Sequence, residues 1–269
     1  MKSPAPTSGT TDTSRPTPTD PRIKTITQHI VEIISDSGEG AQTVGQIFGS
    51  LSARMGNGVW MVEIIPAEIE PPSRSTAGAS GNRIRIGSEQ VNNMGDTADV
   101  VVAFNEQVPY SRMDVGAFRS GTILFLENRW AQHPEEAVRE NYAAAVKDFK
   151  DRGYKVHEIP MEEECLKVVP DAHHGKNIWV LGFLCALYDR DLETARMLVK
   201  KRFTSKGEEV TENNLKLLQA GYTWAHDYLQ VIYQVEIKPG TEPMVVMNGN
   251  MALAMGAMAA GIEVCSMYP

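Results

Sequence analysis

The stretch Ile30-Val-Glu-Ile-Ile-Ser-Asp-Ser-Gly-Glu-Gly-Ala-Gln-Thr-Val-Gly45 decides the fold. Residues 30–34 form a β-branched run that predicts a buried strand, and residues 35–37 carry side-chain oxygens typical of a turn. Gly38 and Gly40 permit backbone angles that a Cβ would forbid, and apolar residues at helical spacing follow them. We therefore expect a strand, a tight turn and a helix whose N-terminus presents free backbone N–H groups.

Two interpretations of this turn remain open. The pattern Gly38-x-Gly40 lacks the third glycine of a dinucleotide-binding fingerprint, because Thr43 stands at that position. Glu39 lies inside the turn and would repel a phosphate. The residues alone therefore predict either a phosphate site or a plain tight corner between a strand and a helix.

Composition and charge exclude several classes of protein. The chain has 269 residues with ordinary globular composition, enough for one large domain or two small ones. Its net charge of −8 argues against nucleic-acid binding, and no apolar run approaches the roughly 18 residues of a membrane span. The three cysteines fit buried thiols in a reducing cytoplasm. Without a C-x-x-C or H-E-x-x-H motif, we expect no iron–sulfur cluster and no metal site.

Strand and helix patterns alternate along the first two thirds of the chain. Residues 59–65 follow the first helix as a second strand, which predicts a parallel βαβ pair with the first. Residues 83–87 alternate and predict an edge or half-buried strand, whereas the apolar run 98–104 predicts a central one. Residues 105–107 then lie where open α/β sheets present ligands. Further strands are expected at 121–128 and 154–160, with a helix at 134–152 between them. These patterns predict a doubly wound, mostly parallel α/β domain.

The last third is expected to be mainly helical. Residues 178–187 are apolar nearly all round and predict a buried helix within a helical region that runs to about Tyr228. The strand-like runs 244–247 and 262–267 flank a helix of small residues. This segment is half a βαβ unit and should pack only weakly. A basic cluster on and after the second helix of this region predicts a solvated face or a phosphate-attracting patch: Arg196, Lys200, Lys201, Arg202 and Lys206.

Five short motifs together resemble the 2-oxoacid:ferredoxin oxidoreductases. They are the glycine-rich turn Gly38-Glu-Gly-Ala-Gln42, the loop Arg74-Ser-Thr-Ala-Gly-Ala-Ser80, the helix start Lys176-Asn-Ile-Trp-Val-Leu-Gly182, the helical tail with Lys206 and Asn213-Asn214 ahead of Ala220-Gly-Tyr222, and the segment from Gly249 to Tyr268-Pro269. Their order, over residues 29–269, is similar to that of a fused large subunit in which a γ domain precedes an α domain. The overall sequence is most similar to the branch of the family that acts on 2-oxoglutarate.

The resemblance implies a domain organisation and a set of cofactors. Residues 1–22 would be a disordered tail, 23–228 a Rossmann-like γ domain, 229–243 a linker, and 244–269 the incomplete start of the pyrimidine-binding α domain. Thiamine diphosphate and Mg would lie mainly in the missing domain and a β subunit, and an iron–sulfur cluster in a partner. No catalytic residue is then expected in this chain, which should be inactive alone.

The resemblance also implies contacts to coenzyme A, the acyl acceptor in this family. They would come from Gly38, Gly40, Gln42, Arg74 and Asn82, with Arg74 on a phosphate. An alternative for Arg74 is a salt bridge that fixes its loop. The sequence departs from the family where relatives often carry glycines, at Glu39 and Ala41 in the turn and at Ala77-Gly78 after Arg74.

The implied reaction converts 2-oxoglutarate, coenzyme A and oxidised ferredoxin to succinyl-CoA, CO2 and reduced ferredoxin, or runs in the carbon-fixing reverse direction. The expected setting is a cytoplasmic hetero-oligomer with a β subunit, with ferredoxin as electron partner. Two alternatives stay open. One is a stand-alone nucleotide-binding Rossmann protein, in which Glu63 stands where a ribose-binding acid would lie. The other is a non-catalytic assembly module.

Overall fold

The computed structural model describes residues 20–172, 175–237 and 244–266. Residues 1–19 of the expected tail lie outside the described residues. Asp20 to Arg22 form a turn instead, and the Arg22 guanidinium donates hydrogen bonds to the carbonyls of His226 and Leu229. These three residues are therefore attached to the end of the last helix of the domain.

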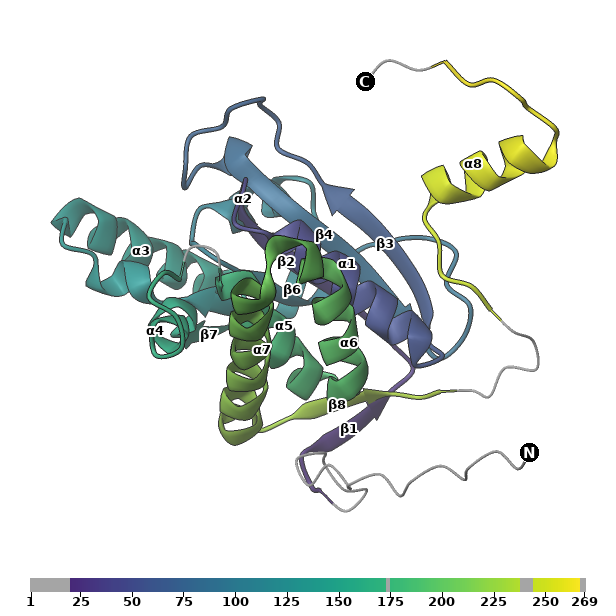
Figure 1. The fold of residues 1–269 in the computed structure, drawn as a ribbon. Helices are drawn as coiled ribbons and strands as arrows, with labels where there is room; N and C mark the ends of the chain where they lie inside the picture. Colours follow the sequence, from purple (N-terminus) through teal and green to yellow (C-terminus); the bar gives the residue numbers. More distant parts are fainter. Residues whose placement is uncertain (1–19, 173–174, 238–243, 267–269) are drawn as a thin grey trace.

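A six-stranded sheet forms the centre of the molecule, in the order β3-β4-β2-β5-β6-β7 (Figure 1). β2, β5, β6 and β7 pair in parallel, whereas β4 is antiparallel to both of its neighbours. The mostly parallel α/β architecture predicted from the sequence is thus confirmed. The strands are β2 (Gln28–Asp36), β3 (Gly58–Ile64), β4 (Ala79–Gly87), β5 (Ala98–Ala103), β6 (Phe118–Glu127) and β7 (Lys155–Ile159).

Two expectations about the strands are wrong. β3 does not pair with β2, because β4 lies between them in the sheet and pairs antiparallel with each. β4 is therefore an interior strand and almost entirely buried, not an edge or half-buried one. Its alternating pattern has another cause: the side chain of Arg83 points into the protein, where it donates hydrogen bonds to Glu32 and to the carbonyl of Met94.

Helices cover both faces of the sheet (Figure 1). On one face, the core cluster contains side chains of α1, α4, α5, α6 and α7, and on the other those of α2 and α3. The two clusters draw on alternate strand residues, such as Val31 and Ile33 against Ile30 and Ile34. The helices are α1 (Ala41–Arg54), α2 (Val108–Asp114), α3 (Glu136–Asp151), α4 (Met161–Leu166), α5 (Lys176–Leu187), α6 (Leu192–Phe203) and α7 (Glu208–Tyr228), with 3₁₀ turns η1 (Thr76–Gly78), η2 (Arg129–Gln132) and η3 (Thr204–Lys206).

Helix α5 is buried on nearly every side, as its sequence predicts. It crosses α7 at two glycines, Gly182 and Gly221. A Cβ on Gly182 would lie 2.0 Å from the carbonyl oxygen of Leu218, and one on Gly221 would lie 1.9 Å from that of Trp179. The two backbones are therefore in direct contact, and no larger residue fits at either position.

The segments after α7 differ from the sequence-based expectation. The expected linker 229–243 contains a strand, β8 (Ile232–Val235), which pairs in parallel with β1 (Ile23–Ile26), while residues 238–243 lie outside the described residues. Helix α8 (Gly249–Ala259) forms as expected and buries none of its residues. The strands expected on either side of it are absent from the described residues 244–248 and 260–266, because no neighbouring strand offers hydrogen bonds there.

A buried ion triad joins β2, β4 and α2. The fully buried carboxylate of Glu32 accepts hydrogen bonds from Arg83 at 2.8 Å and from two nitrogens of Arg112 at 3.0 and 2.9 Å. Both guanidiniums are largely buried, so each depends on this one carboxylate for charge compensation.

We predict that Glu32→Ala lowers the free energy of unfolding by about 3–5 kcal/mol, because two guanidiniums lose their counter-charge inside the protein. Urea denaturation measures this change. Lys147→Ala, which removes an exposed ion pair with Asp151, is the control and should leave the unfolding midpoint nearly unchanged. A loss below about 1 kcal/mol for Glu32→Ala would show that water compensates the two arginines.

Candidate functional site

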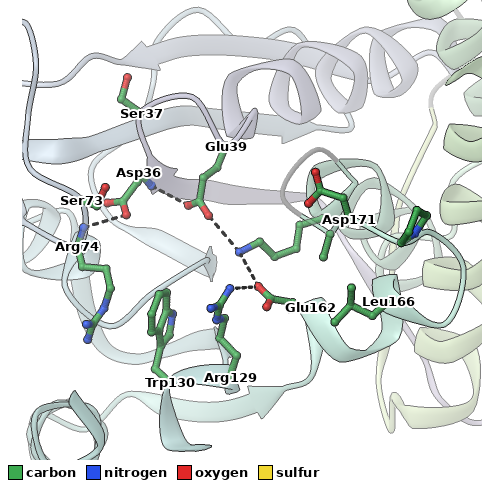
Figure 2. Close-up of a pocket in the computed structure, with 13 residues that line it drawn as sticks. Asp36, Ser37, Glu39, Ser73, Arg74, Arg129, Trp130, Glu162, Leu166 and Asp171 are labelled. Carbon is green, nitrogen blue, oxygen red and sulfur yellow. Dashed lines mark hydrogen bonds and ion pairs between the residues drawn. The ribbon is translucent and has the colours of Figure 1, made fainter. Parts of the chain in front are cut away.

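A cavity of about 350 Å³ opens at the carboxyl-terminal edge of the parallel strands (Figure 2). β2 leads into α1 on one face of the sheet, whereas its parallel neighbour β5 leads into α2 on the other. Such a divergence of connections is where open α/β sheets bind ligands. The cavity is lined by Asp36, Ser37, Glu39, Ser73, Arg74, Arg129, Trp130, Glu162, Leu166, Pro170, Asp171, Ala172 and Lys176.

The glycine-containing turn after β2 forms one wall of this pocket. Gly38 and Gly40 adopt φ angles of +92° and +85°, which disfavour any residue with a Cβ. A Cβ on Gly40 would also lie 2.3 Å from the side-chain nitrogen of Asn177, so the glycine lets the start of α5 approach the turn. Glu39 consequently faces Lys176, whose Nζ lies 3.0 Å from the Glu39 carboxylate and 3.8 Å from that of Glu162.

The opposite wall is built around Trp130. Figure 2 shows its indole between Arg74 and Arg129, whose guanidinium carbons lie 4.3 and 4.5 Å from the ring centroid. Each guanidinium also pairs with a glutamate, Arg74 with the fully buried Glu106 and Arg129 with Glu162. This wall therefore consists of two compensated cations separated by one aromatic ring.

The backbone of Arg74 is unusual. Its φ angle is +52°, and its N–H donates to the Asp36 carboxylate at 2.8 Å. Burial raises the pKa of Asp36, and the neighbouring Glu39 adds to this rise, while the N–H of Arg74 opposes it. The loop residue Arg74 is thus connected to the end of β2 by its backbone and to the end of β5 by its side chain.

A second buried acid lies behind the pocket. Glu127, the last residue of β6, is fully buried and accepts hydrogen bonds from the N–H groups of Arg129 at 3.0 Å and Glu162 at 2.9 Å. Burial raises the pKa of Glu127 to about 7, although nearby Lys176 opposes the rise. Glu127 therefore connects the wall containing Trp130 to helix α4, and it is close to its own titration point at neutral pH.

Comparison with known proteins identifies the family. The family model for pyruvate ferredoxin/flavodoxin oxidoreductase matches residues 31–224. The chain belongs to the pyruvate ferredoxin/flavodoxin oxidoreductase family. It is 28% identical over 248 residues to the 2-oxoglutarate oxidoreductase subunit KorA of Mycobacterium tuberculosis, a match that covers 86% of this chain and 37% of KorA. The chain thus spans well under half of that relative.

Solved structures of this family share the fold. The 2-oxoglutarate:ferredoxin oxidoreductase of Magnetococcus marinus, solved with 2-oxoglutarate, coenzyme A and succinyl-CoA bound, matches with a TM-score of 0.69 at 24% identity, over 88% of this chain and 38% of its own. The γ subunit of a keto/oxoacid ferredoxin oxidoreductase from Geobacter sulfurreducens matches with a TM-score of 0.53 at 17% identity. This match covers 74% of this chain and 96% of the γ subunit. The family resemblance and fold class inferred from the sequence are therefore confirmed.

The residues proposed for coenzyme A binding separate into two groups in this family member. Arg74 lines the pocket, and Gly38 and Gly40 shape the turn at its wall. Gln42 and Asn82 lie together elsewhere, between α1 and β4, where the Asn82 side chain donates to the carbonyl of Gln42 at 2.7 Å. These two side chains are engaged in helix–sheet contacts and do not line the pocket.

Among the pocket residues that the sequence did not assign to a site are Arg129, Trp130 and Glu162, together with Lys176, which was noted only as the start of a family motif. They come from η2, α4 and the first turn of α5, which the chain brings together only in three dimensions. One available signal was the position of Arg129 and Trp130 just after a buried strand. The expected ligand-presenting edge at 105–107 does contribute, since Glu106 holds Arg74.

The described residues limit the chemistry available here. Across residues 20–172, 175–237 and 244–266, no group of three or more His, Cys, Asp or Glu side chains could hold a metal ion. Burial raises the pKa of Cys165 and Cys185 to about 12, so neither supplies a thiolate at neutral pH. No helix in the described ranges is long and apolar enough to cross a membrane.

The pH dependence of stability tests the buried carboxyl of Glu127. Its folded pKa of about 7 lies above the ordinary value of 4.5, so between these values the native state holds a proton that the unfolded chain lacks. The free energy of unfolding should therefore fall as the pH rises through this range. Relative to Glu127→Gln, the wild type should lose roughly 1–3 kcal/mol between pH 5 and pH 8.

Urea denaturation at each pH measures this difference, and Glu63→Gln gives the baseline for replacing an exposed, hydrogen-bonded glutamate. The opposite result is that the wild type and Glu127→Gln differ in free energy of unfolding by the same amount at every pH. That result would show that Glu127 is ionised in the folded state throughout the range.

Proposed function

We propose that this chain supplies the γ-type domain of a 2-oxoacid:ferredoxin oxidoreductase that acts on 2-oxoglutarate. The observation that carries the proposal is the similarity to KorA along nearly the whole chain. The reaction would use coenzyme A and oxidised ferredoxin and release succinyl-CoA and CO2, or run in reverse. The cytoplasm, where ferredoxin is found, would be its location.

Within such an enzyme, the role of this domain would be to bind and orient coenzyme A. Thiamine diphosphate, when bound, supplies the carbanion chemistry at the 2-oxo carbon. Its site would lie in a further α domain and a β subunit, and the iron–sulfur cluster in a partner. The pocket at the divergence of β2 and β5 is the place in this chain where a polar co-substrate would bind.

The charges of the pocket restrict how a phosphate could bind. Four acidic side chains line it and three basic ones, so its field does not favour anions in general. Arg74 nevertheless lines the pocket with a side chain that stays 19% exposed while it pairs with Glu106. Of the acids that line the pocket, Glu39 is compensated by Lys176 and Asp36 has a raised pKa. One phosphate oxygen could therefore accept a hydrogen bond from Arg74.

The geometry gives less support to a stand-alone dinucleotide-binding protein. That alternative depends on Glu63 as a ribose-binding acid. Glu63 lies on β3, which is an edge strand separated from β2 by β4, and its carboxylate accepts a hydrogen bond from Gln46. This position is remote from the divergence of β2 and β5, where the ligand would bind.

Activity measurements test the proposed reaction. The purified chain alone should not reduce viologen dye with 2-oxoglutarate, because the proposed thiamine diphosphate site would lie in a further α domain and a β subunit. The complete subunit assembled with its β subunit should do so, with a requirement for thiamine diphosphate and coenzyme A and a preference for 2-oxoglutarate over pyruvate. Preference for pyruvate would contradict the substrate, and thiamine-dependent activity of the chain alone would contradict the assignment of the cofactor site.

Calorimetry tests the contact between Arg74 and coenzyme A. Arg74→Ala should weaken coenzyme A binding by about 1–3 kcal/mol, the value of a hydrogen bond to a charged group. The effect should shrink at high salt. Arg152→Ala, which removes an exposed arginine that pairs with Asp148, is the matched control. Unchanged affinity in a folded Arg74→Ala variant would leave Arg74 with its structural salt bridge to Glu106 alone.

A further inference from the structure

Trp130 has a position that core formation does not explain. Its ring is only partly buried, at the rim of the second core cluster, and its Nε1 donates to the carbonyl of Phe104 at 3.3 Å. This hydrogen bond fixes the plane of the indole at the end of β5. The fixed ring then lies beside two guanidiniums, those of Arg74 and Arg129 (Figure 2).

Arg74 is restrained at three points. Asp36 holds its backbone, Glu106 holds one side of its guanidinium, and Trp130 covers the face of the guanidinium at 4.3 Å from the ring centroid. An arginine on a loop otherwise samples many rotamers, which a ligand would have to restrict on binding. The three restraints leave the guanidinium in one orientation, and the side chain lines the pocket and remains 19% exposed.

The same ring also keeps two like charges apart. Arg74 and Arg129 line one pocket, and without a spacer their guanidiniums would repel each other. The negative faces of the indole attract both cations, and Glu106 and Glu162 hold their outer sides. An aliphatic side chain of similar size would fill the space but would not attract either cation.

We infer that Trp130 is a positioning residue for co-substrate binding, acting through Arg74. It holds the guanidinium of Arg74 in the orientation that receives a phosphate group in the pocket. The inference rests on the proposed function, in which coenzyme A is the ligand.

Calorimetry of the full chain with coenzyme A tests this role. Trp130→Phe keeps an aromatic face and should stay within about threefold of the wild-type Kd, whereas Trp130→Leu should raise the Kd about tenfold, the value of a partly desolvated cation–π contact. Trp130→Met is a second aliphatic variant in case Trp130→Leu does not fold. Trp60→Leu, at an exposed position on β3, is the matched control and should bind as the wild type does.

A double-mutant cycle separates positioning from a structural role. In an Arg74→Ala background, replacing Trp130 by Leu should weaken binding no further, because the group that Trp130 positions is absent. Equal weakening in both backgrounds would overturn the inference, since Trp130 would then act on the ligand or on the fold. So would wild-type affinity in Trp130→Leu or Trp130→Met. If the wild-type chain itself bound no coenzyme A, the proposed co-substrate site would be wrong. That result can be told apart from failure of the Trp130 inference, in which the wild type binds coenzyme A but the variants do not behave as expected.

Discussion

The direct backbone contact between α5 and α7, at Gly182 and Gly221, is the constraint on which the pocket depends. It sets the distance of α5 from its neighbour, and the sheet covers the opposite side of the helix. Lys176, in the first turn of α5, is 2% exposed and reaches two glutamates from different elements. A Cβ at either glycine would overlap a carbonyl oxygen and displace the helix, and Lys176 would move with it.

The charges around the pocket form a connected series. It runs from Asp36 and Glu39 through Lys176, Glu162 and Arg129 to Trp130 and Arg74, and Arg74 returns to Asp36 through its backbone. Opposite charges compensate one another locally, which lowers the cost of burying them. The result is a polar site whose side chains are paired with one another before any ligand binds, and such preorganisation saves conformational entropy on binding.

The sequence predicted the strands and helices well because their apolar periods are long and clear, as in 98–104 and 178–187. The placement of β4 between β2 and β3 was not predicted, since the proline-rich connection before it carries no periodic signal. For the site, the turn and Arg74 were found from local motifs. The contacts of Arg74 with Glu106 and Trp130 join residues 32 positions and more apart, and only the sheet order brings them together.

The small β1–β8 sheet has a mechanical consequence. Its strands are parallel, β1 near the start of the domain and β8 near its end, and their register is continuous from Ile23 opposite Ile232 to Ile26 opposite Val235. Tension that pulls the preceding and following chain apart would draw the two strands in opposite directions along their common axis. The hydrogen bonds between them would then bear the load in shear, all at once and not one after another. This arrangement would shield the sheet behind it, and the pocket at its edge, from strain transmitted by whatever is attached on either side.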